Sequence, residues 1–354
     1  MGVSLQQKFK TYIMKKLLFC LAMLGFALGM KAQSDVVTRD TRIYSIIGKD
    51  TLRMDAYINP KAEVNPEGRP VLMYIHGGGW TMGSRVNAAQ EIYCRYMAER
   101  GWLALSIDYR LVGVSVNTDG VVQKLSDLVG SNMIAAKTAC SDVVDATNFV
   151  LQQKDWKADP NKFCLAGGSA GAIAALQTVY DSCNKEEYTQ RLPKGFAYAG
   201  AISQAGCILI ESGQQRLTWK KKPCPMMLIH GTEDNAMPLG VLELDCRFIG
   251  TEPITDQLEE MGVPYWKWIE RGADHVMAMR TLTVYLEEQY HFLRDFVENG
   301  QQTSIITESK EKVPATMSSV DAMIQYVPFY ILGYGMYLDQ MDWNNMKKPE
   351  NIVF

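Results

Sequence analysis

The chain has 354 residues, of which 47% are hydrophobic and 21% are charged, and its formal net charge is −3. This length fits one large domain with additions, or two smaller domains, of ordinary globular composition. An acidic chain without a basic cluster lacks the charge pattern of nucleic-acid-binding proteins, so we expect no nucleic-acid partner.

Residues 1–32 have the pattern of a secretory signal peptide. Lys15 and Lys16 precede the apolar run Leu17–Met30, and Ala32 supplies a small residue at the expected cleavage site. The run is too short and wrongly flanked for a membrane span, and an uncleaved membrane anchor is the alternative. The sequence therefore predicts export to the periplasm or the extracellular space, with no membrane span in the mature chain. Because residues 1–32 hold five lysines and no acidic residue, their removal makes the chain more acidic.

The cysteines follow no metal-binding spacing. One of the eight, Cys20, lies in the apolar run, which leaves an odd number scattered without C-x-x-C pairs. In an oxidising compartment one or two disulfides could form, and Cys207 with Cys224 is the first candidate pair. The sequence predicts no metal and no other cofactor.

Strand-like and helix-like segments alternate from residue 40 to about residue 298. The predicted strands are Arg42–Ile47, Arg53–Ile58, Val71–His76, Leu103–Asp108, Lys162–Gly167, Ala197–Ser203, Met226–His230 and Tyr265–Glu270. The predicted helices are Ala88–Arg100, Ile134–Gln153, Ala170–Cys183, Ile254–Met261 and Leu282–Val297. The first two strands have no helix between them and predict an antiparallel hairpin. The alternation predicts an α/β domain over residues 33–298, a doubly wound, mostly parallel sheet of eight strands with helices on both faces.

The chain changes character after residue 298. Residues 299–312 are polar and predict a linker, and residues 313–354 bring aromatic residues and methionines. We expect this last segment to dock against the main domain, with a partner-binding role as the alternative. Closer to the middle of the chain, residues 112–129 could form a partial flap.

The pentapeptide Gly167–Gly171 fits the G-x-S-x-G pattern, in which a sharp turn between a strand and a helix raises a serine hydroxyl above the sheet. The apolar run before it predicts a buried strand, and the Ala-rich run Ala170–Tyr180 predicts a helix. Small residues suit such a turn because a larger side chain would collide with the strand or the helix. Ser169 is therefore the predicted nucleophile. A glycine-rich turn that contains a serine by chance is the alternative.

A serine hydroxyl is a weak nucleophile, so Ser169 requires a base and an acid further along the chain. The chain has four histidines, His76, His230, His275 and His291. His275 lies in a loop after the last predicted strand and is the predicted base. Asp234 follows the predicted strand Met226–His230 and would orient the histidine and stabilise its protonated form. Glu233 and Asp274 are the alternative acids.

The run from His76 to Trp80 (HGGGW) follows the apolar residues Val71–Ile75 of a predicted strand and suits an oxyanion hole. Glycines let the backbone approach a substrate closely. The backbone N–H groups of Gly78, Gly79 and Ala170 are the predicted oxyanion donors, and each such donor is typically worth about 3 kcal/mol of transition-state stabilisation. His76 is then a structural residue that holds the loop.

These motifs together resemble those of the α/β hydrolases, in the group of carboxylesterases and hormone-sensitive-lipase-like proteins. The chain also resembles acetyl and feruloyl esterases and kynurenine formamidases that share the H-G-G-x-W loop. The residues that carry the resemblance are HGGGW at 76–80, DYRL at 108–111, GGSAG at 167–171, HGTED at 230–234 and GADH at 272–275. The resemblance implies a Ser169, Asp234 and His275 triad and an α/β-hydrolase fold.

The sequence thus predicts an exported serine esterase acting through an acyl-enzyme on a small-molecule or polysaccharide ester, of the acetyl or feruloyl type. Ser169 and Asp234 are close in sequence, which leaves little room for a large lid and favours an open site. Trp80 and Tyr109 are the predicted aromatic walls for substrate, although either could belong to the core. The alternatives are amide hydrolysis on the same triad, as in a formamidase or a peptidase, and a non-catalytic hydrolase-like binding protein.

Overall fold

The computed structural model describes residues 36–112 and 131–309. The expected signal peptide and the expected C-terminal docking segment at 313–354 lie outside the described residues. Of the expected flap at 112–129, only residue 112 is among the described residues.

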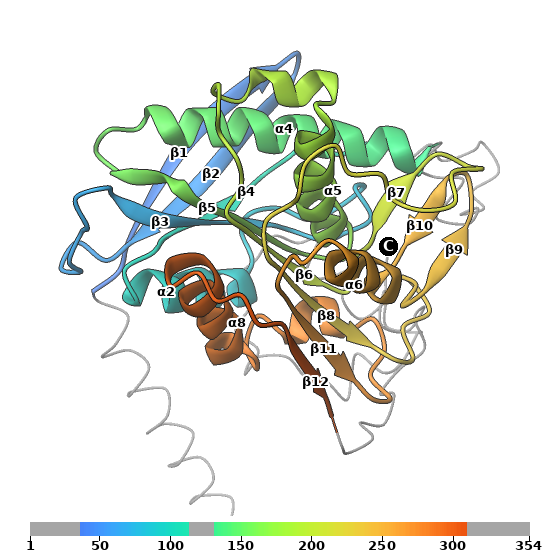
Figure 1. Ribbon diagram of the computed structural model, residues 1–354. Helices are drawn as coiled ribbons and strands as arrows, with labels where there is room; N and C mark the ends of the chain where they lie inside the picture. The colour runs from blue at the N-terminus through green and yellow to red at the C-terminus, as the bar shows by residue number, and fades with distance from the viewer. Residues whose placement is uncertain (1–35, 113–130, 310–354) are drawn as a thin grey trace, which may run out of the picture.

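A nine-stranded sheet forms the centre of the molecule, in the order β1-β2-β4-β3-β5-β6-β8-β11-β12 (Figure 1). Its strands are β1 (Thr38–Ile47), β2 (Asp50–Ile58), β3 (Arg69–Ile75), β4 (Leu103–Ile107), β5 (Ala158–Gly168), β6 (Gly200–Gln204), β8 (Met226–Gly231), β11 (Tyr265–Glu270) and β12 (Ile305–Glu308). From β4 to β12 all neighbours are parallel, whereas β1 and β2 form an antiparallel hairpin at one edge. The predicted doubly wound, mostly parallel α/β sheet is confirmed, and all eight predicted strands are present.

The expected strand count and the expected linker need correction at β12. This strand lies within residues 299–312, where a linker was expected, and it pairs in parallel with β11 from Trp266 opposite Ile305 to Ile269 opposite Glu308. Its side chains alternate between half-buried and exposed, as expected of an edge strand with one face on the protein. The sheet therefore has nine strands, and the folded domain continues past residue 298.

Helices cover both faces of the sheet (Figure 1). They are α2 (Ala88–Glu99), α4 (Asn132–Gln152), α5 (Ala170–Asn184), α6 (Thr251–Glu260), α7 (Met277–Arg280) and α8 (Leu286–Phe292), with the short helical turns η1 (Glu187–Arg191) and η2 (Leu293–Glu298). One buried apolar cluster includes side chains of α4, α5 and α6, and the other includes side chains of α2, α7 and α8. Each face of the sheet thus has its own core, which explains why the central strands are apolar on both sides.

A second, three-stranded antiparallel sheet has the order β7-β10-β9. Its strands are β7 (Ile208–Ile210), β9 (Val241–Glu243) and β10 (Arg247–Ile249). Strand β7 follows closely after the carboxyl end of β6, and β9 and β10 follow the loop after β8. This small sheet therefore lies near the carboxyl edge of the parallel sheet, and its three short strands were not among the eight predicted from the sequence.

The strand order reverses at one place along that edge, next to β3. After β3 the chain passes through α2 to β4 on one side, and it later returns across β3 to β5 on the other side. In open α/β sheets, ligands bind outside the carboxyl ends of the strands where the strand order reverses in this way. The oxyanion motif follows β3 and the serine motif follows β5, so the reversal brings these two motifs together.

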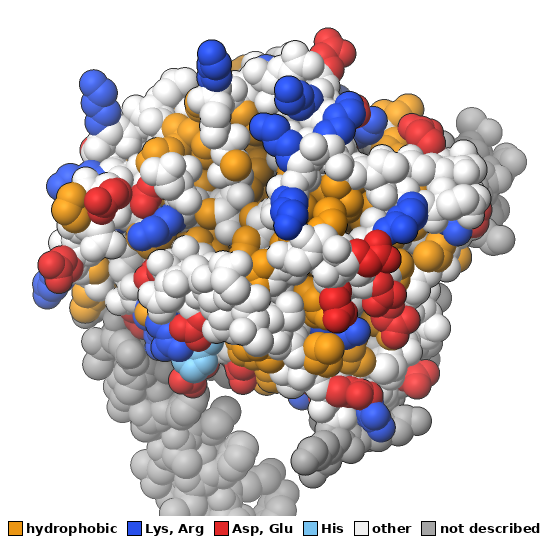
Figure 2. Space-filling view, viewed as in Figure 1, with side chains coloured by type: hydrophobic (Ala, Val, Ile, Leu, Met, Phe, Trp, Pro, Cys, Tyr) orange, Lys and Arg blue, Asp and Glu red, His pale blue; other side chains and the backbone are white. Residues whose placement is uncertain are grey.

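The next features concern the cysteines, membrane-spanning helices and metal ligands of the described residues. All seven cysteines in residues 36–112 and 131–309 are free, so the expected Cys207–Cys224 disulfide is not formed. Within the same residues no helix is long and apolar enough to cross a membrane, and no group of His, Cys, Asp or Glu could hold a metal ion. The face in Figure 2 carries basic and acidic side chains as well as apolar surface.

Candidate active site

Ser169 occupies a strained turn between β5 and α5. Its backbone has φ 54° and ψ −124°, in a region that side-chain-bearing residues avoid at a cost of about 1–3 kcal/mol. Two backbone hydrogen bonds hold this conformation: the N–H of Ser169 donates to Gln204 O at 2.9 Å, and its carbonyl accepts from Ile173 N at 3.0 Å. The structure therefore has the strand, turn and helix that the G-x-S-x-G motif requires.

A glycine two residues after the serine lets α5 approach the oxyanion motif. A Cβ atom on Gly171 would lie 2.0 Å from the carbonyl oxygen of Ile75 and 2.5 Å from that of His76. No side chain fits in such a space, so only glycine allows the first turn of α5 to lie against the end of β3. This contact places the serine turn beside the loop that begins at His76.

The structure brings the three predicted triad residues into one chain of hydrogen bonds. The His275 Nε2 atom lies 2.8 Å from Ser169 Oγ, and the His275 Nδ1 atom lies 2.8 Å from Asp234 Oδ2. Because a carboxylate only accepts, Nδ1 carries the proton, and Nε2 is free to accept the serine hydroxyl proton. The histidine side chain is 16% exposed, while that of Asp234 is 1% exposed.

Asp234 is held as a carboxylate in the interior. Its Oδ1 atom accepts the backbone N–H groups of Ala236 at 2.8 Å and Met237 at 2.9 Å. Burial acts to raise the pKa of Asp234, but the hydrogen bonds and charges of His230 and His275 outweigh it and bring that pKa below its ordinary value. An ionised carboxylate beside Nδ1 is what a base at His275 requires.

The two alternative acids do not meet His275. Glu233 has an exposed side chain in the loop after β8. Asp274 is buried, but its Oδ1 atom accepts the backbone N–H of Val276 at 3.0 Å. Among the candidate acids, the geometry therefore selects Asp234.

The loop after β3 has the backbone of an oxyanion loop. Gly78 and Gly79 have φ angles of 116° and 58°, and a Cβ on Gly78 would lie 2.2 Å from the carbonyl oxygen of Met82. Within the described part of the chain, the backbone N–H groups of Gly78 and Gly79 donate to no backbone acceptor, and Ala170 is the first residue of α5, where the N–H has no acceptor within the helix. Three unengaged donors beside a serine hydroxyl could bind a negatively charged oxygen.

His76 and Tyr109 form a buried stack under this loop. Their rings lie 4.2 Å apart with an interplanar angle of 19°, and the Tyr109 hydroxyl donates to the carbonyl of His76 at 3.1 Å. Burial lowers the pKa of His76 to about 4, so this histidine is neutral, and its Nδ1–H donates to Gly77 O at 2.7 Å. The structural role expected for His76 agrees with these contacts.

Trp80 and Tyr109 do not form open walls. Both are only 3% exposed and belong to the core on the α4 and α5 face of the sheet. Trp80 and Tyr109 were expected to be either substrate walls or core residues, and their burial favours the core. Trp80 has φ 60°, and its carbonyl accepts the backbone N–H of Val112 at 2.8 Å, so it also shapes the turn after the oxyanion loop.

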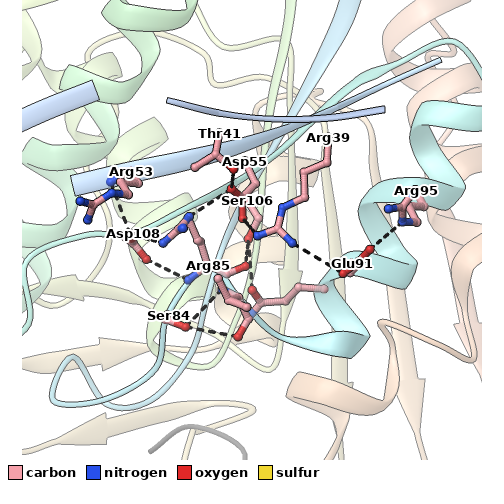
Figure 3. A network of polar contacts seen from close by, with 12 residues as sticks. Arg39, Thr41, Arg53, Asp55, Ser84, Arg85, Glu91, Arg95, Ser106 and Asp108 are labelled. Carbon is pink, nitrogen blue, oxygen red and sulfur yellow. Dashed lines mark hydrogen bonds and ion pairs between the residues drawn. The ribbon is translucent and has the colours of Figure 1, made fainter. Parts of the chain in front are cut away.

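A network of ion pairs fixes the segment that follows the oxyanion loop (Figure 3). Arg85 lies between Asp108, whose Oδ2 is 2.9 Å from its Nη1, and the fully buried Asp55, whose Oδ1 is 3.2 Å from its Nε. Asp55 also accepts from Arg39 at 2.7 Å and from Thr41 at 2.6 Å. The loop is thereby tied to β1, β2 and the end of β4.

The motif DYRL is tied to α4 by a second buried acid. Asp142 accepts both the backbone N–H of Arg110, at 2.7 Å, and its guanidinium, with contacts at 2.7 and 2.9 Å. The Asp142 side chain is fully buried, so removal of its partner would leave a buried charge uncompensated. This pair anchors the strand end that carries Tyr109.

Two residues outside the predicted motifs support the triad. Gln204, at the end of β6, accepts the backbone N–H of Ser169, and His230, at the end of β8, lies 3.4 Å from the carboxylate of Asp234. A weak signal exists for both, since each ends a predicted parallel strand or closely follows one.

Comparisons with known proteins found one family model and several esterases that are similar to this chain. A family model described as BD-FAE matches residues 54–123. Gut esterase 1 of Caenorhabditis elegans is 27% identical over 148 residues, which are 42% of this chain and 24% of that protein. A probable isoprenylcysteine alpha-carbonyl methylesterase of Oryza sativa subsp. japonica is 26% identical over 227 residues, which are 54% of this chain and 49% of that protein. The chain thus spans less than half the length of either relative.

A solved structure, the apo form of esterase 2 from Thermogutta terrifontis, is similar over 74% of this chain and 95% of that one. The two share 22% sequence identity, with a TM-score of 0.49. The sheet topology and the order of the motifs are those of the α/β-hydrolase fold, and the chain is similar to the BD-FAE family model and to esterases over parts of its length.

Proposed function

We propose that this protein is a serine carboxylic-ester hydrolase that works through an acyl-enzyme. The observation that carries the proposal is the chain of hydrogen bonds from Ser169 Oγ through His275 to Asp234, with both distances at 2.8 Å. Such a chain turns a weak hydroxyl nucleophile into an effective one, because the proton has an oriented acceptor when the serine attacks.

In the first half of the reaction, Ser169 Oγ forms a bond to the ester carbonyl carbon while His275 Nε2 takes the hydroxyl proton. The carbonyl oxygen becomes negatively charged and accepts from the N–H groups of Gly78, Gly79 and Ala170. When the tetrahedral intermediate collapses, the bond to the alcohol oxygen breaks and His275 returns the proton to that oxygen. The alcohol leaves, and the acyl group stays on Ser169.

In the second half, water replaces the alcohol. His275 takes a proton from the water as its oxygen bonds to the acyl carbon, and the same three N–H groups stabilise the second oxyanion. The bond to Ser169 Oγ then breaks, the serine recovers its proton from His275, and the carboxylic acid leaves. Asp234 stays ionised throughout and stabilises the protonated histidine.

The substrate that we propose is a short-chain or carbohydrate-linked acyl ester, of the acetyl or feruloyl type. The residues between Ser169 and Asp234 are taken up by α5, η1, β6, β7 and β8, so this interval holds no inserted lid domain. A site without a lid at this position favours small or extended acyl esters over long-chain lipids. The resemblance of the HGGGW loop to that of acetyl and feruloyl esterases supports the same choice.

We also propose that the protein is exported, to the periplasm or the extracellular space. The support is the sequence pattern of residues 1–32, with two lysines ahead of an apolar run. Cell fractionation of the expressing organism, with antibody against the mature protein and a check for loss of residues 1–32 by mass spectrometry, tests this step. Recovery of the uncleaved chain in the cytoplasm would contradict it.

The test of the esterase proposal compares wild type with Ser169→Ala on p-nitrophenyl acetate, butyrate and octanoate. We expect hydrolysis to fall with chain length, and Ser169→Ala to lower kcat by about 10⁴-fold or more. Ser212→Ala, in an exposed loop, is the matched control and should behave as wild type. Intact-protein mass spectrometry after rapid quenching should detect the acyl group on wild type and on Ser212→Ala.

Other outcomes would change the assignment. Turnover of p-nitroacetanilide faster than of p-nitrophenyl acetate would favour an amide hydrolase on the same triad. Full activity of Ser169→Ala would exclude this serine as the nucleophile. Folded protein that turns over no ester and no amide would favour a hydrolase-like binding protein. If the esterase test succeeds, acetylated xylan and methyl ferulate are the next substrates, and activity on neither would contradict the proposed substrate class.

A further inference from the structure

A second histidine lies against the triad carboxylate, and the mechanism above does not use it. His230 is the last residue but one of β8, and its side chain is 0% exposed. Its Nε2 atom lies 3.4 Å from Asp234 Oδ2 and 3.3 Å from the carbonyl oxygen of Met237. On the other side of the ring, Nδ1 lies 2.9 Å from the hydroxyl oxygen of Thr251, the first residue of α6. All polar edges of the ring are therefore engaged.

These partners determine where the proton of His230 lies. A carbonyl and a carboxylate face Nε2, and both can only accept, so Nε2 carries a proton shared between them. The Thr251 hydroxyl can then donate to the unprotonated Nδ1, which fixes this tautomer. Both Nε2 distances are longer than an ordinary hydrogen bond, in keeping with one donor divided between two acceptors.

Asp234 thereby receives donors on both oxygens. Two backbone N–H groups of the loop after β8 reach Oδ1, whereas the side chains of His275 and His230 both face Oδ2. The backbone donors belong to the same loop as the aspartate and move with it. His230 belongs to the central sheet, so its N–H links the triad carboxylate directly to a rigid part of the fold.

We propose that His230 is a positioning residue, which holds Oδ2 of Asp234 opposite His275 through its Nε2–H, an inference that rests on the proposed function. The Nε2–H group of His230 also affects the protonation of Asp234. Asp234 is the charged group that His230 meets among the described residues, and His275 meets the same carboxylate oxygen. The positive end of the Nε2–H bond lies near Oδ2 of Asp234, so it favours the ionised carboxylate.

The experiment uses two amides of different length in place of the ring. In His230→Gln the side-chain N–H₂ can reach the position of Nε2 and still donate to Asp234. In His230→Asn the amide nitrogen reaches only the position of Nδ1, beside Thr251. His291→Gln and His291→Asn are matched controls on α8, where the histidine side chain is 35% exposed. All variants are measured for kcat, KM, thermal stability and the pH profile of kcat/KM with p-nitrophenyl acetate.

We expect His230→Asn to lower kcat by about tenfold or more with little change in KM, since a charge-assisted hydrogen bond is lost. We expect the acid limb of its kcat/KM profile to move to higher pH by roughly half a unit, because a positive dipole beside the triad is removed. His230→Gln should recover most of kcat and the wild-type limb. Both His291 variants should match wild type.

Two results would overturn the proposal. One is an Asn variant with wild-type kcat and an unmoved acid limb. The other is equal loss of kcat in the Asn and Gln variants with no movement of the limb, which is the behaviour of a residue that only fills space. If the Asn variant does not fold, Thr251→Val decides, because it removes the donor that fixes the ring. A lower kcat in that variant supports the proposal, and an unchanged kcat overturns it. The comparison of wild type with Ser169→Ala comes first and tests the esterase proposal alone. The His230 variants are measured only if that test succeeds, so failure of the His230 proposal is distinguishable from failure of the esterase proposal.

Discussion

The hydroxyl of Tyr109 donates to the carbonyl oxygen of His76, while the two rings stack 4.2 Å apart. His76 directly follows β3 and Tyr109 follows β4, so the pair joins neighbouring parallel strands at the carboxyl edge of the sheet. His76 is also the first residue of the oxyanion loop. The position of that loop therefore depends on a side chain that lies 33 residues further along the chain.

Replacement of Tyr109 by Phe tests the hydrogen bond separately from the stack. We expect Tyr109→Phe to lower the free energy of unfolding by about 1–2 kcal/mol and to lower kcat, because the carbonyl of His76 loses its donor and the loop is held less firmly. Tyr109→Leu, which also removes the stack, should lower both further. Urea unfolding and kcat for p-nitrophenyl acetate are the measurements. Equal stability of the Phe variant and wild type would contradict the assigned bond.

The serine turn and the triad could be predicted from the sequence because each depends on local signals. A strand, a glycine-flanked serine and an Ala-rich helix are adjacent in the chain, so the turn between them follows from the sequence. Asp234 and His275 each follow a parallel strand, and the carboxyl ends of parallel strands meet at one edge. The distances between these side chains then depend on the sheet order, which the alternation of elements indicates.

The elements that the sequence did not indicate depend on distant partners. Strand β12 has four residues, and its register exists only because β11 lies beside it. The small sheet joins β7 with β10, two segments separated by the whole of β8 and its loop. His230 and Gln204 act through contacts with residues from other strands, so no short motif reports their roles. Trp80 and Tyr109 pointed to a substrate wall only by their type, and their burial was not visible in the pattern.

A pH-dependent contribution to stability follows from the burial of His76. Its pKa in the folded protein is about 4, below the ordinary value of 6.5, so the unfolded chain binds the proton more tightly. Stability is therefore gained as the pH rises from about 4 to about 6.5 and is lost as the pH falls through the same range, by about 3 kcal/mol in total.

His76→Asn isolates this contribution, because its amide keeps a donor near the position of Nδ1 and does not titrate. We expect the free energy of unfolding of wild type minus that of the variant to increase between pH 4 and pH 6.5. Urea unfolding of both proteins across this range measures the difference, in which other titrating groups cancel. Parallel curves for the two proteins would mean that His76 can be protonated in the folded state.

The pH dependence of stability that Asp181 contributes should have the opposite sign to that of His76. It accepts from Gln177 at 2.9 Å and from Tyr188 at 2.6 Å, and burial raises its pKa to about 6 from an ordinary value of 3.8. The folded protein binds this proton more tightly, so stability is present at low pH and is lost as the pH rises from about 4 to about 6. The free energy of unfolding of wild type minus that of Asp181→Asn should decrease over that range. An increase instead would show that the carboxylate is the favoured form in the folded state.

Gln204 links the nucleophile to the segment after His275. Its backbone oxygen accepts the N–H of Ser169, and its side-chain amide donates to Gln289 Oε1 at 2.8 Å. Gln289 in turn donates to the carbonyls of Thr281 and Tyr285, which lie between α7 and α8. Gln204→Leu keeps the backbone bond but leaves Gln289 Oε1 without this donor in the interior.

We expect Gln204→Leu to lower the free energy of unfolding by about 1–3 kcal/mol, the cost of a buried polar atom that loses its partner. Denaturation with urea measures the effect. Gln190→Leu, at an exposed position on η1, is the matched control and should stay within about 0.5 kcal/mol of wild type. Equal stability of the two variants would contradict the role given to the Gln204 side chain.

Gly171 is a position at which one added methyl group should displace the nucleophile. Its Cβ would lie 2.0 Å from the carbonyl oxygen of Ile75, so Gly171→Ala forces α5 away from β3. This movement shifts Ser169 relative to the N–H groups of Gly78 and Gly79. We expect Gly171→Ala to lower kcat by about 100-fold or more if the protein folds, since small displacements of reacting groups carry such penalties. Gly240→Ala, where a Cβ meets nothing within 4 Å, should keep wild-type kcat and stability. Wild-type kcat in Gly171→Ala would show that the contact between α5 and β3 does not determine the position of the nucleophile.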